Sequence, residues 1–244
     1  MKLDFCFPKE KKEAQEKRTP LVLVGGTVEY HGPQCAFGCD TLIAEGLVNE
    51  LAKRRDLIVA PTISYSPASW AVGGDTTGTV HIDEVVFEEY VFQVFMSMLS
   101  AGWRNIYVVI HHQFEEGNLM PMTLSYMKAA KRATMRYLEK TMGQGWWGSE
   151  QYANYYENLG GGDDPFSWIK VIPAMSPRAQ RETGYDHAGK YECSILMALY
   201  PDAVKLERLG DIPHWFTASS AEASTALGKK MLEISLEELD QAIG

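Results

Sequence analysis

Short apolar runs alternate with longer amphipathic stretches along this chain, and the alternation predicts strands followed by helices. Runs of branched apolar residues, typical of strands buried on both faces, occur at 20–26, 57–65, 105–110 and 168–174. Apolar residues recur at helical spacing over 9–18, 41–56, 84–101, 120–140, 188–200 and 219–243, the last capped by Ser219 or Ser220. The pattern predicts an α/β fold of three layers, with helices on both faces of a mostly parallel central sheet.

The segment 142–166 interrupts this alternation. It reads MGQGWWGSEQYANYYENLGGGDDPF, is rich in glycine, aromatic and acidic residues, and has no regular period. Irregular segments of this length in a compact domain are usually functional or disordered, and the aromatic residues favour a functional role. We therefore expect a lid or an intersubunit arm.

Length, charge and hydropathy restrict the class of protein. The 244 residues are enough for a single domain, 1–244, whose core needs no disulfides. A net charge of −9 argues against binding nucleic acid or an anionic membrane. No apolar run is long enough to span a bilayer, and the charged N-terminus lacks the apolar core of a signal peptide. A cytoplasmic location is expected.

Titratable residues follow the predicted strands directly. Glu29 and His31 come after the first strand, and His111 and His112 come after the third. Because ligands of parallel sheets bind beyond the carboxyl ends of the strands, these side chains should meet at one edge. Glu29 and His31 would share one side of an extended backbone. The pattern Glu-x-His is also common in ordinary loops, which remain an alternative at this point.

Carboxylates and imidazoles make up the whole candidate set, which is Glu29, His31, Asp40, His112, Glu115, Glu116, His187 and Glu192. Mixed nitrogen and oxygen ligands are typical of Zn, Mn or Fe in a catalytic role. A carboxylate such as Asp40 could bridge two cations in a hydrolytic site. Cys35 and Cys39 could supply zinc thiolates, but no second pair completes such a site, so buried or incidental thiols are expected.

Four motifs, in the same order, resemble those of the creatininase family. They are GGTVEYHGPQCAFGCDTLIAEGL, GDTTGTVHID, AGWRNIYVVIHHQFEEGN and DHAGKYECSILMALYPDAVKLERL, and they cover most of residues 20–210. The resemblance implies an α/β fold, two divalent cations per chain and hydrolysis of cyclic amides or formamides. It also implies a homo-oligomer, which is a hexamer in that family.

The resemblance assigns roles by motif position. Glu29, His31 and Asp40 match metal ligands, with Asp40 bridging, and His112 matches the histidine after the third strand. Glu192 is expected as a further metal ligand, and the catalytic acid or base is expected among His187, Glu116 and Glu115. The residues expected to contact substrate are Ser69, Trp70, Trp146, Trp147 and Asp186. For the aromatic residues of 142–166, a subunit interface is an equal alternative.

Three departures from the family motifs leave assignments open. The family's Asn-Gly-His reads Ile110-His111-His112 here, so either histidine could bind metal, although position favours His112. The following HQFEEGN is longer than its counterpart, so Glu115, Glu116 or Glu192 could supply the second metal's carboxylate. A family histidine is replaced around Trp70, which leaves the substrate open.

The expected function is a metal-dependent amidohydrolase that uses Zn, Mn or Fe to activate water against a cyclic, lactam- or creatinine-like amide, or another small amide. Alternatives within the family are a formamide hydrolase acting on a pyrimidine nucleotide-like substrate, and a peptidase. Recognition of phosphate would need basic side chains, and only Arg178, Arg181 and Lys190 lie near a motif. The alternative from another class is a non-catalytic protein that binds metal or a small molecule.

Overall fold

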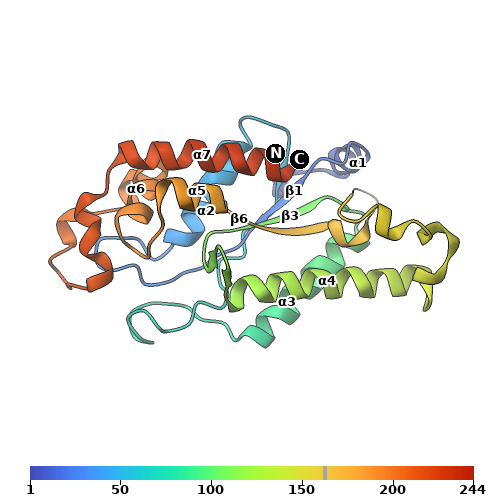
Figure 1. Cartoon of the computed structure of the whole chain (residues 1–244), viewed down its shortest axis with the longest axis horizontal. Coiled ribbons are helices and arrows are strands. Elements are labelled where there is room, and N and C mark those ends of the chain that lie inside the picture. Colours follow the sequence, from blue (N-terminus) through green and yellow to red (C-terminus); the bar gives the residue numbers. More distant parts are fainter. Residues whose placement is uncertain (162–163) are drawn as a thin grey trace.

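Four parallel strands form the centre of the computed structural model, which describes residues 1–161 and 164–244 (Figure 1). Their order across the sheet is β2–β1–β3–β6. The strands are β1 (Leu21–Val24), β2 (Ile58–Val59), β3 (Ile106–Ile110) and β6 (Ile169–Pro173). In the register, Val22 lies beside Tyr107 and Val109 beside Ile172. The predicted parallel sheet is confirmed.

Alternating side chains of the strands build two cores, one on each face of the sheet. Val22 and Val24 point into one core, and Leu21 and Leu23 point into the other, as the two-residue period of a strand requires. The first core is covered by α2 (Cys39–Leu51), α5 (Pro177–Thr183), α6 (Lys190–Leu199) and α7 (Thr225–Ile243). The second is covered by α1 (Pro8–Glu16), α3 (Glu84–Ser100) and α4 (Pro121–Met142). The predicted α/β fold of three layers is confirmed (Figure 1).

Two details of the sequence prediction were wrong. The strand expected at 57–65 contains only two residues in β2, because Pro61 has no N–H to donate to a neighbouring strand. The last helix is capped by neither predicted serine: Ser224 accepts the Leu227 N–H at 3.2 Å, and the chain before it forms a 3-10 helix, Trp215–Glu222. The prediction also missed α5 and a short hairpin, β4 (Phe114–Glu115) and β5 (Asn118–Leu119).

The aromatic segment 142–166 lies at the far end of α4. This helix has 22 residues, so it is about 33 Å long at 1.5 Å per residue. It starts beside the hairpin that follows β3 and ends where the aromatic segment begins, as Figure 1 shows. The described part of the segment contains short 3-10 turns. No helix in the described part of the chain is both long and apolar enough to cross a membrane.

Candidate metal centre

The carboxyl ends of β1 and β3 bring the candidate ligands together. Glu29 and His31 lie in the loop between β1 and α2, and Asp40 is in the first turn of α2. His111 and His112 follow β3, and Glu192 is in the first turn of α6. Since β1 and β3 are parallel neighbours, these loops and helix starts meet at one edge of the sheet.

One group of donors consists of Glu29, Asp40 and His112, all of them buried. His112 Nδ1 lies 3.2 Å from Glu29 Oε2 and 3.3 Å from Asp40 Oδ2. Neither contact has hydrogen-bond geometry, and both carboxylate oxygens lack a hydrogen-bond partner within the described residues. Donor atoms that face one another without bonding in this way are arranged as they would be around a shared cation.

A second group adjoins the first through Asp40. His31 Nε2 lies 3.7 Å from Asp40 Oδ1 and 3.5 Å from Glu192 Oε2. The two oxygens of Asp40 therefore face different histidines, Oδ1 towards His31 and Oδ2 towards His112. A carboxylate between two nitrogen donors has the geometry of a bridge between two cations.

Neighbouring groups fix the orientation of these candidate ligands. His31 Nδ1 lies 3.0 Å from the backbone oxygen of Glu29, so it donates there and leaves the Nε2 lone pair for the second group. His111 Nε2 lies 3.0 Å from Glu192 Oε1, while Glu192 Oε2 accepts the Ala188 N–H at 2.6 Å. The two adjacent histidines thus have different surroundings: His112 faces Glu29 and Asp40, and His111 contacts Glu192.

The charges of the cluster fit divalent cations. Glu29, Asp40 and Glu192 are three buried carboxylates in one small volume, and buried charges are stable only when they are compensated. Burial alone would lower the pKa of His112, but Asp40 and Glu29 raise it to about 10. Burial would raise the pKa of Asp40, but His31 and His112 lower it well below its usual range. Without metal, protonated histidines must supply the positive charge that cations would otherwise provide.

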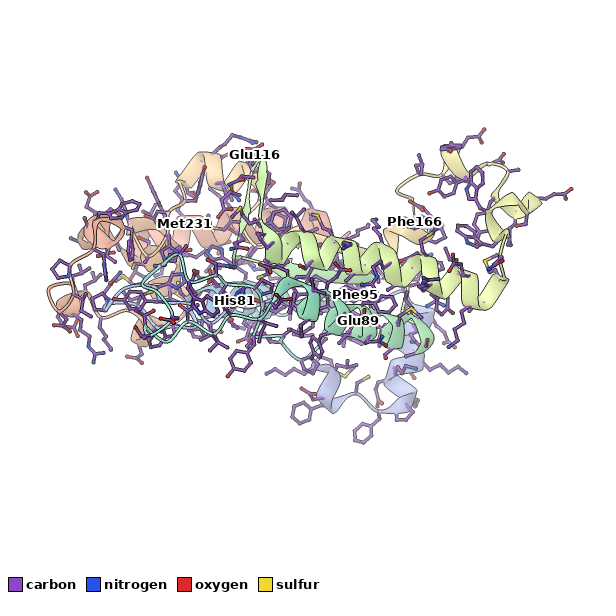
Figure 2. All side chains as sticks on the ribbon, turned by 90° about the horizontal axis from the view of Figure 1, so that it is seen from below. His81, Glu89, Phe95, Glu116, Phe166 and Met231 are labelled. Carbon is purple, nitrogen blue, oxygen red and sulfur yellow. The ribbon has the colours of Figure 1, made fainter. Side chains whose placement is uncertain are left out.

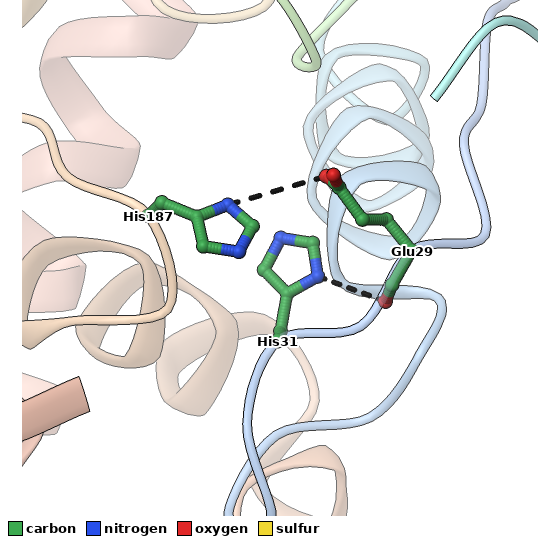
Figure 3. A group of neighbouring side chains, drawn as sticks. All are labelled: Glu29, His31 and His187. Carbon is green, nitrogen blue, oxygen red and sulfur yellow. Dashed lines mark hydrogen bonds and ion pairs between the residues drawn. The ribbon is translucent and has the colours of Figure 1, made fainter. Parts of the chain in front are cut away.

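His187 lies on the more exposed side of the cluster. Its ring is 4.3 Å from the ring of His31, and its Nδ1 is 4.0 Å from Glu29 Oε2 (Figure 3). Its Nε2 lies 3.2 Å from the backbone oxygen of Tyr30. The side chain is 30% exposed, whereas the carboxylates and the other histidines of the cluster are at most 9% exposed. The His187 ring is therefore accessible to solvent while it lies beside the carboxylate of Glu29, a candidate metal ligand.

The two glutamates of the hairpin have different surroundings. Glu115 lines a small cavity together with His111, Asp186 and Glu192. Glu116 does not line that cavity: its side chain is half exposed and bonds to Arg181 at 2.6 and 2.7 Å. Figure 2 shows Glu116 on the projecting hairpin. The structure thus separates Glu116 from the cluster, and Glu115 is the closer candidate for a catalytic role.

Of the residues expected at the substrate, Asp186 lies beside Glu192, whereas the contacts of Ser69 and Trp70 are with His81. The Asp186 carboxylate accepts the Tyr191 and Glu192 N–H groups at 3.1 Å, so it caps the start of α6. Burial raises the pKa of Asp186, and these backbone donors oppose the rise. Ser69 and Trp70 are exposed: the Ser69 N–H donates to His81 Nδ1, and the Trp70 ring packs edge-on against the His81 ring.

Trp146 and Trp147 do not lie at this centre within one chain. Trp146 is buried against Tyr152 at the end of α4, and Trp147 packs edge-on against Tyr155 and Tyr156. The length of α4 separates them from the cluster, and Figure 2 shows the neighbouring Phe166 at the same remote end. A substrate contact from these residues would require a second copy of the chain.

Two ring side chains beside His187, Phe216 and His214, were not predicted from the sequence. Phe216 packs against the His187 ring at 5.5 Å and stacks on His214 at 4.7 Å. His214 Nε2 lies 3.0 Å from the Tyr30 hydroxyl. The contact between His214 and Tyr30 joins positions 184 residues apart, and no spacing within the sequence signals it. The position of Tyr30 between the predicted ligands Glu29 and His31 was the sequence feature that placed an aromatic residue at this site.

Comparisons with known proteins identify the family. The family model Creatininase, described as creatinine amidohydrolase, matches residues 8–243. A creatinine amidohydrolase from Pseudomonas putida is 23% identical over 197 residues, which are 79% of this chain and 69% of the relative.

Solved structures share the fold. A creatinine amidohydrolase (creatininase) has a TM-score of 0.73 at 22% identity, covering 100% of this chain and 96% of that one. A Mn creatininase has a TM-score of 0.73, and a mutant creatininase of the Zn-Zn type has 0.72. Both are 20% identical to this chain, and each match covers 99% of this chain and 96% of the solved one. Because the family model covers nearly the whole sequence, this chain belongs to the creatininase family.

Proposed function

We propose that this protein is a metal-dependent hydrolase of small amides, with two cation positions joined by Asp40. The observation that carries the proposal is that the two Asp40 oxygens face His31 and His112 separately. Glu29 and His112 would hold one cation, and His31 and Glu192 the other. The solved relatives include a Mn and a Zn-Zn creatininase, which favours Mn or Zn here.

Different residues of this chain would bind the cations and transfer the proton during hydrolysis. Divalent cations, when bound, polarise an amide carbonyl and lower the pKa of a water molecule from about 15.7 towards 7. Glu29, Asp40 and Glu192 provide the negative charge that holds the cations. His187 would carry the proton lost by the attacking water to the leaving nitrogen, a contribution of about 10² to 10⁴ in rate, and its contact with Glu29 supports this role. Glu115 is the second candidate for this role.

Charge pairing favours a substrate without phosphate. The three basic residues nearest the family motifs already have acidic partners: Arg181 pairs with Glu116, Lys190 with Glu222, and Arg178 with three glutamates. A phosphate would therefore have to displace existing ion pairs. This supports a cyclic or other small amide, creatinine-like in class, over a nucleotide-like formamide. The homo-oligomeric state and the cytoplasmic location stay predictions.

A hydrolysis screen tests the proposal. Protein reconstituted with Zn or Mn would be assayed against lactams, cyclic ureas, formamides and short peptides, with Asp40→Asn as the inactive control. Glu116→Gln is the matched control, because its side chain lies outside the cluster and should leave hydrolysis intact. Turnover of a small amide that needs metal and Asp40 supports the proposal. Full metal loading without turnover on any substrate would favour a binding protein.

A further inference from the structure

Cys39 lies against the second group of donors. It is the first residue of α2, directly before Asp40, and it is fully buried. Its sulfur, a ring nitrogen of His31 and a carboxylate oxygen of Glu192 all lie within 4.8 Å of one another. Zinc binds nitrogen at about 2.0 Å and sulfur at about 2.3 Å, so small side-chain rotations would let these three atoms share one ion.

His31 supplies an independent indication that a ligand binds here. Its side chain is completely buried, and its Nε2 has no hydrogen-bond partner within the described residues. Since Nδ1 is occupied by the Glu29 backbone oxygen, Nε2 is the atom that faces this group. A buried ring nitrogen without a partner is costly unless something binds to it.

We propose that Cys39 is a sulfur ligand of the cation held by His31 and Glu192, an inference that rests on the proposed metal centre. On binding, the S–H bond breaks, a sulfur–metal bond forms, and the proton passes to solvent. The two cation positions then differ in chemistry. Glu29, Asp40 and His112 offer oxygen and nitrogen, which suit Mn, whereas the position with Cys39 is softer and prefers Zn, Co or Fe.

The place of Cys39 in the fold supports this role. α2 has 13 residues, and the dipole at its N-terminus favours an anionic sulfur. A hydrogen bond with Cys35 lowers the pKa of the Cys39 thiol, but burial and the nearby Glu192 and Asp40 raise it overall, so a bound cation is what would hold the thiolate here. The simpler alternative is that Cys39 only fills the core, since it also packs among apolar residues there. Cys193 is a buried cysteine of that simpler kind. Its thiol donates to the Ala188 backbone oxygen at 3.6 Å, and it belongs to no donor group among the described residues.

Cobalt provides a direct spectroscopic test. Chelator-treated protein would be titrated with Co²⁺, which absorbs in the near ultraviolet when a thiolate binds it. We expect this band in the wild type and in the matched control Cys193→Ser, and its loss in Cys39→Ser. In a competition between Zn and Mn, the ratio of the affinity for Zn to the affinity for Mn should be about tenfold or more lower in Cys39→Ser than in the wild type. A band that persists in Cys39→Ser would overturn the assignment.

X-ray absorption of the zinc-loaded wild type needs no variant and guards against misfolding of Cys39→Ser. We expect a sulfur scatterer at about 2.3 Å from zinc. Two bound ions surrounded only by nitrogen and oxygen would refute the role of Cys39 and leave the proposed function standing. Absence of any tightly bound ion would instead refute the metal centre itself.

Discussion

Binding of a cation should release a proton from His112, and the charges around that ring set the size of the effect. Burial alone would lower its pKa, but Glu29 Oε2 and Asp40 Oδ2, 3.2 and 3.3 Å from Nδ1, raise the pKa to about 10 without metal. At pH 7.5 the ring is then protonated in roughly 99% of molecules or more. A cation can take Nδ1 only after that proton leaves.

The magnitude follows from the distance between the pH and this pKa. Each pH unit below about 10 makes loss of the proton costlier by about 1.4 kcal/mol, a factor of ten in affinity. From pH 8 to pH 7, the apparent dissociation constant should therefore rise about tenfold, with about one proton released per cation at this position. Burial lowers the pKa of His31 and His111, but nearby carboxylates raise it overall, so these rings can only add to the effect.

Calorimetry measures both quantities. Zn²⁺ would be titrated into chelator-treated protein at pH 7 and pH 8, in two buffers with different enthalpies of ionisation, which yields the number of protons released. Glu116→Gln should behave like the wild type, because its side chain pairs with Arg181 outside the cluster. A dissociation constant independent of pH, with no proton release, would refute the assignment of His112 to the centre.

Asp40→Ala should remove both cations, whereas Glu116→Ala should keep both. The measurement is the metal content per chain after dialysis. Retention of metal by Asp40→Ala would exclude a bridging role for Asp40. Metal-free protein should lose stability as pH rises from 6.5 towards about 10. The pKa of His112 is higher in the folded than in the unfolded protein, so protonation of this ring stabilises the fold fully only below pH 6.5. Thermal melting at several pH values tests this, and a flat profile would contradict it. Gly228→Ala should lower the free energy of unfolding by about 1–3 kcal/mol or more, because its Cβ would lie 1.9 Å from a backbone oxygen of α6. Gly210→Ala, with open space around it, is the control in urea unfolding.

The fold could be predicted because its elements carry strong local signals. β1 and β3 are uninterrupted apolar runs, and α3 and α4 have a helical stripe, so burial of each element could be inferred without its neighbours. The hairpin of β4 and β5 gives a weak signal, since two-residue strands are too short to show a period. The cap of α7 was misplaced because Ser219 and Ser220 bond to the start of α6, a contact that depends on tertiary structure.

The candidate site was predictable in part for the same reason. Glu29, His31 and Asp40 lie in one short loop and the helix start after it, so the sequence alone places them together. The contact between His111 and Glu192 joins residues 81 positions apart, and it depends on how α6 packs beside the sheet. The remote position of Trp147 depends on the direction and length of α4. Aromatic composition indicated an interaction surface but carried no information about which end of the molecule it occupies.

The central claim is that Asp40 joins two cation positions, and metal content tests it most directly. Protein reconstituted with Zn or Mn and dialysed without chelator would be analysed by elemental mass spectrometry alongside its concentration. The account predicts close to two ions per chain in the wild type. A folded wild-type protein that retains no ion, or never more than one at saturating metal, would contradict it.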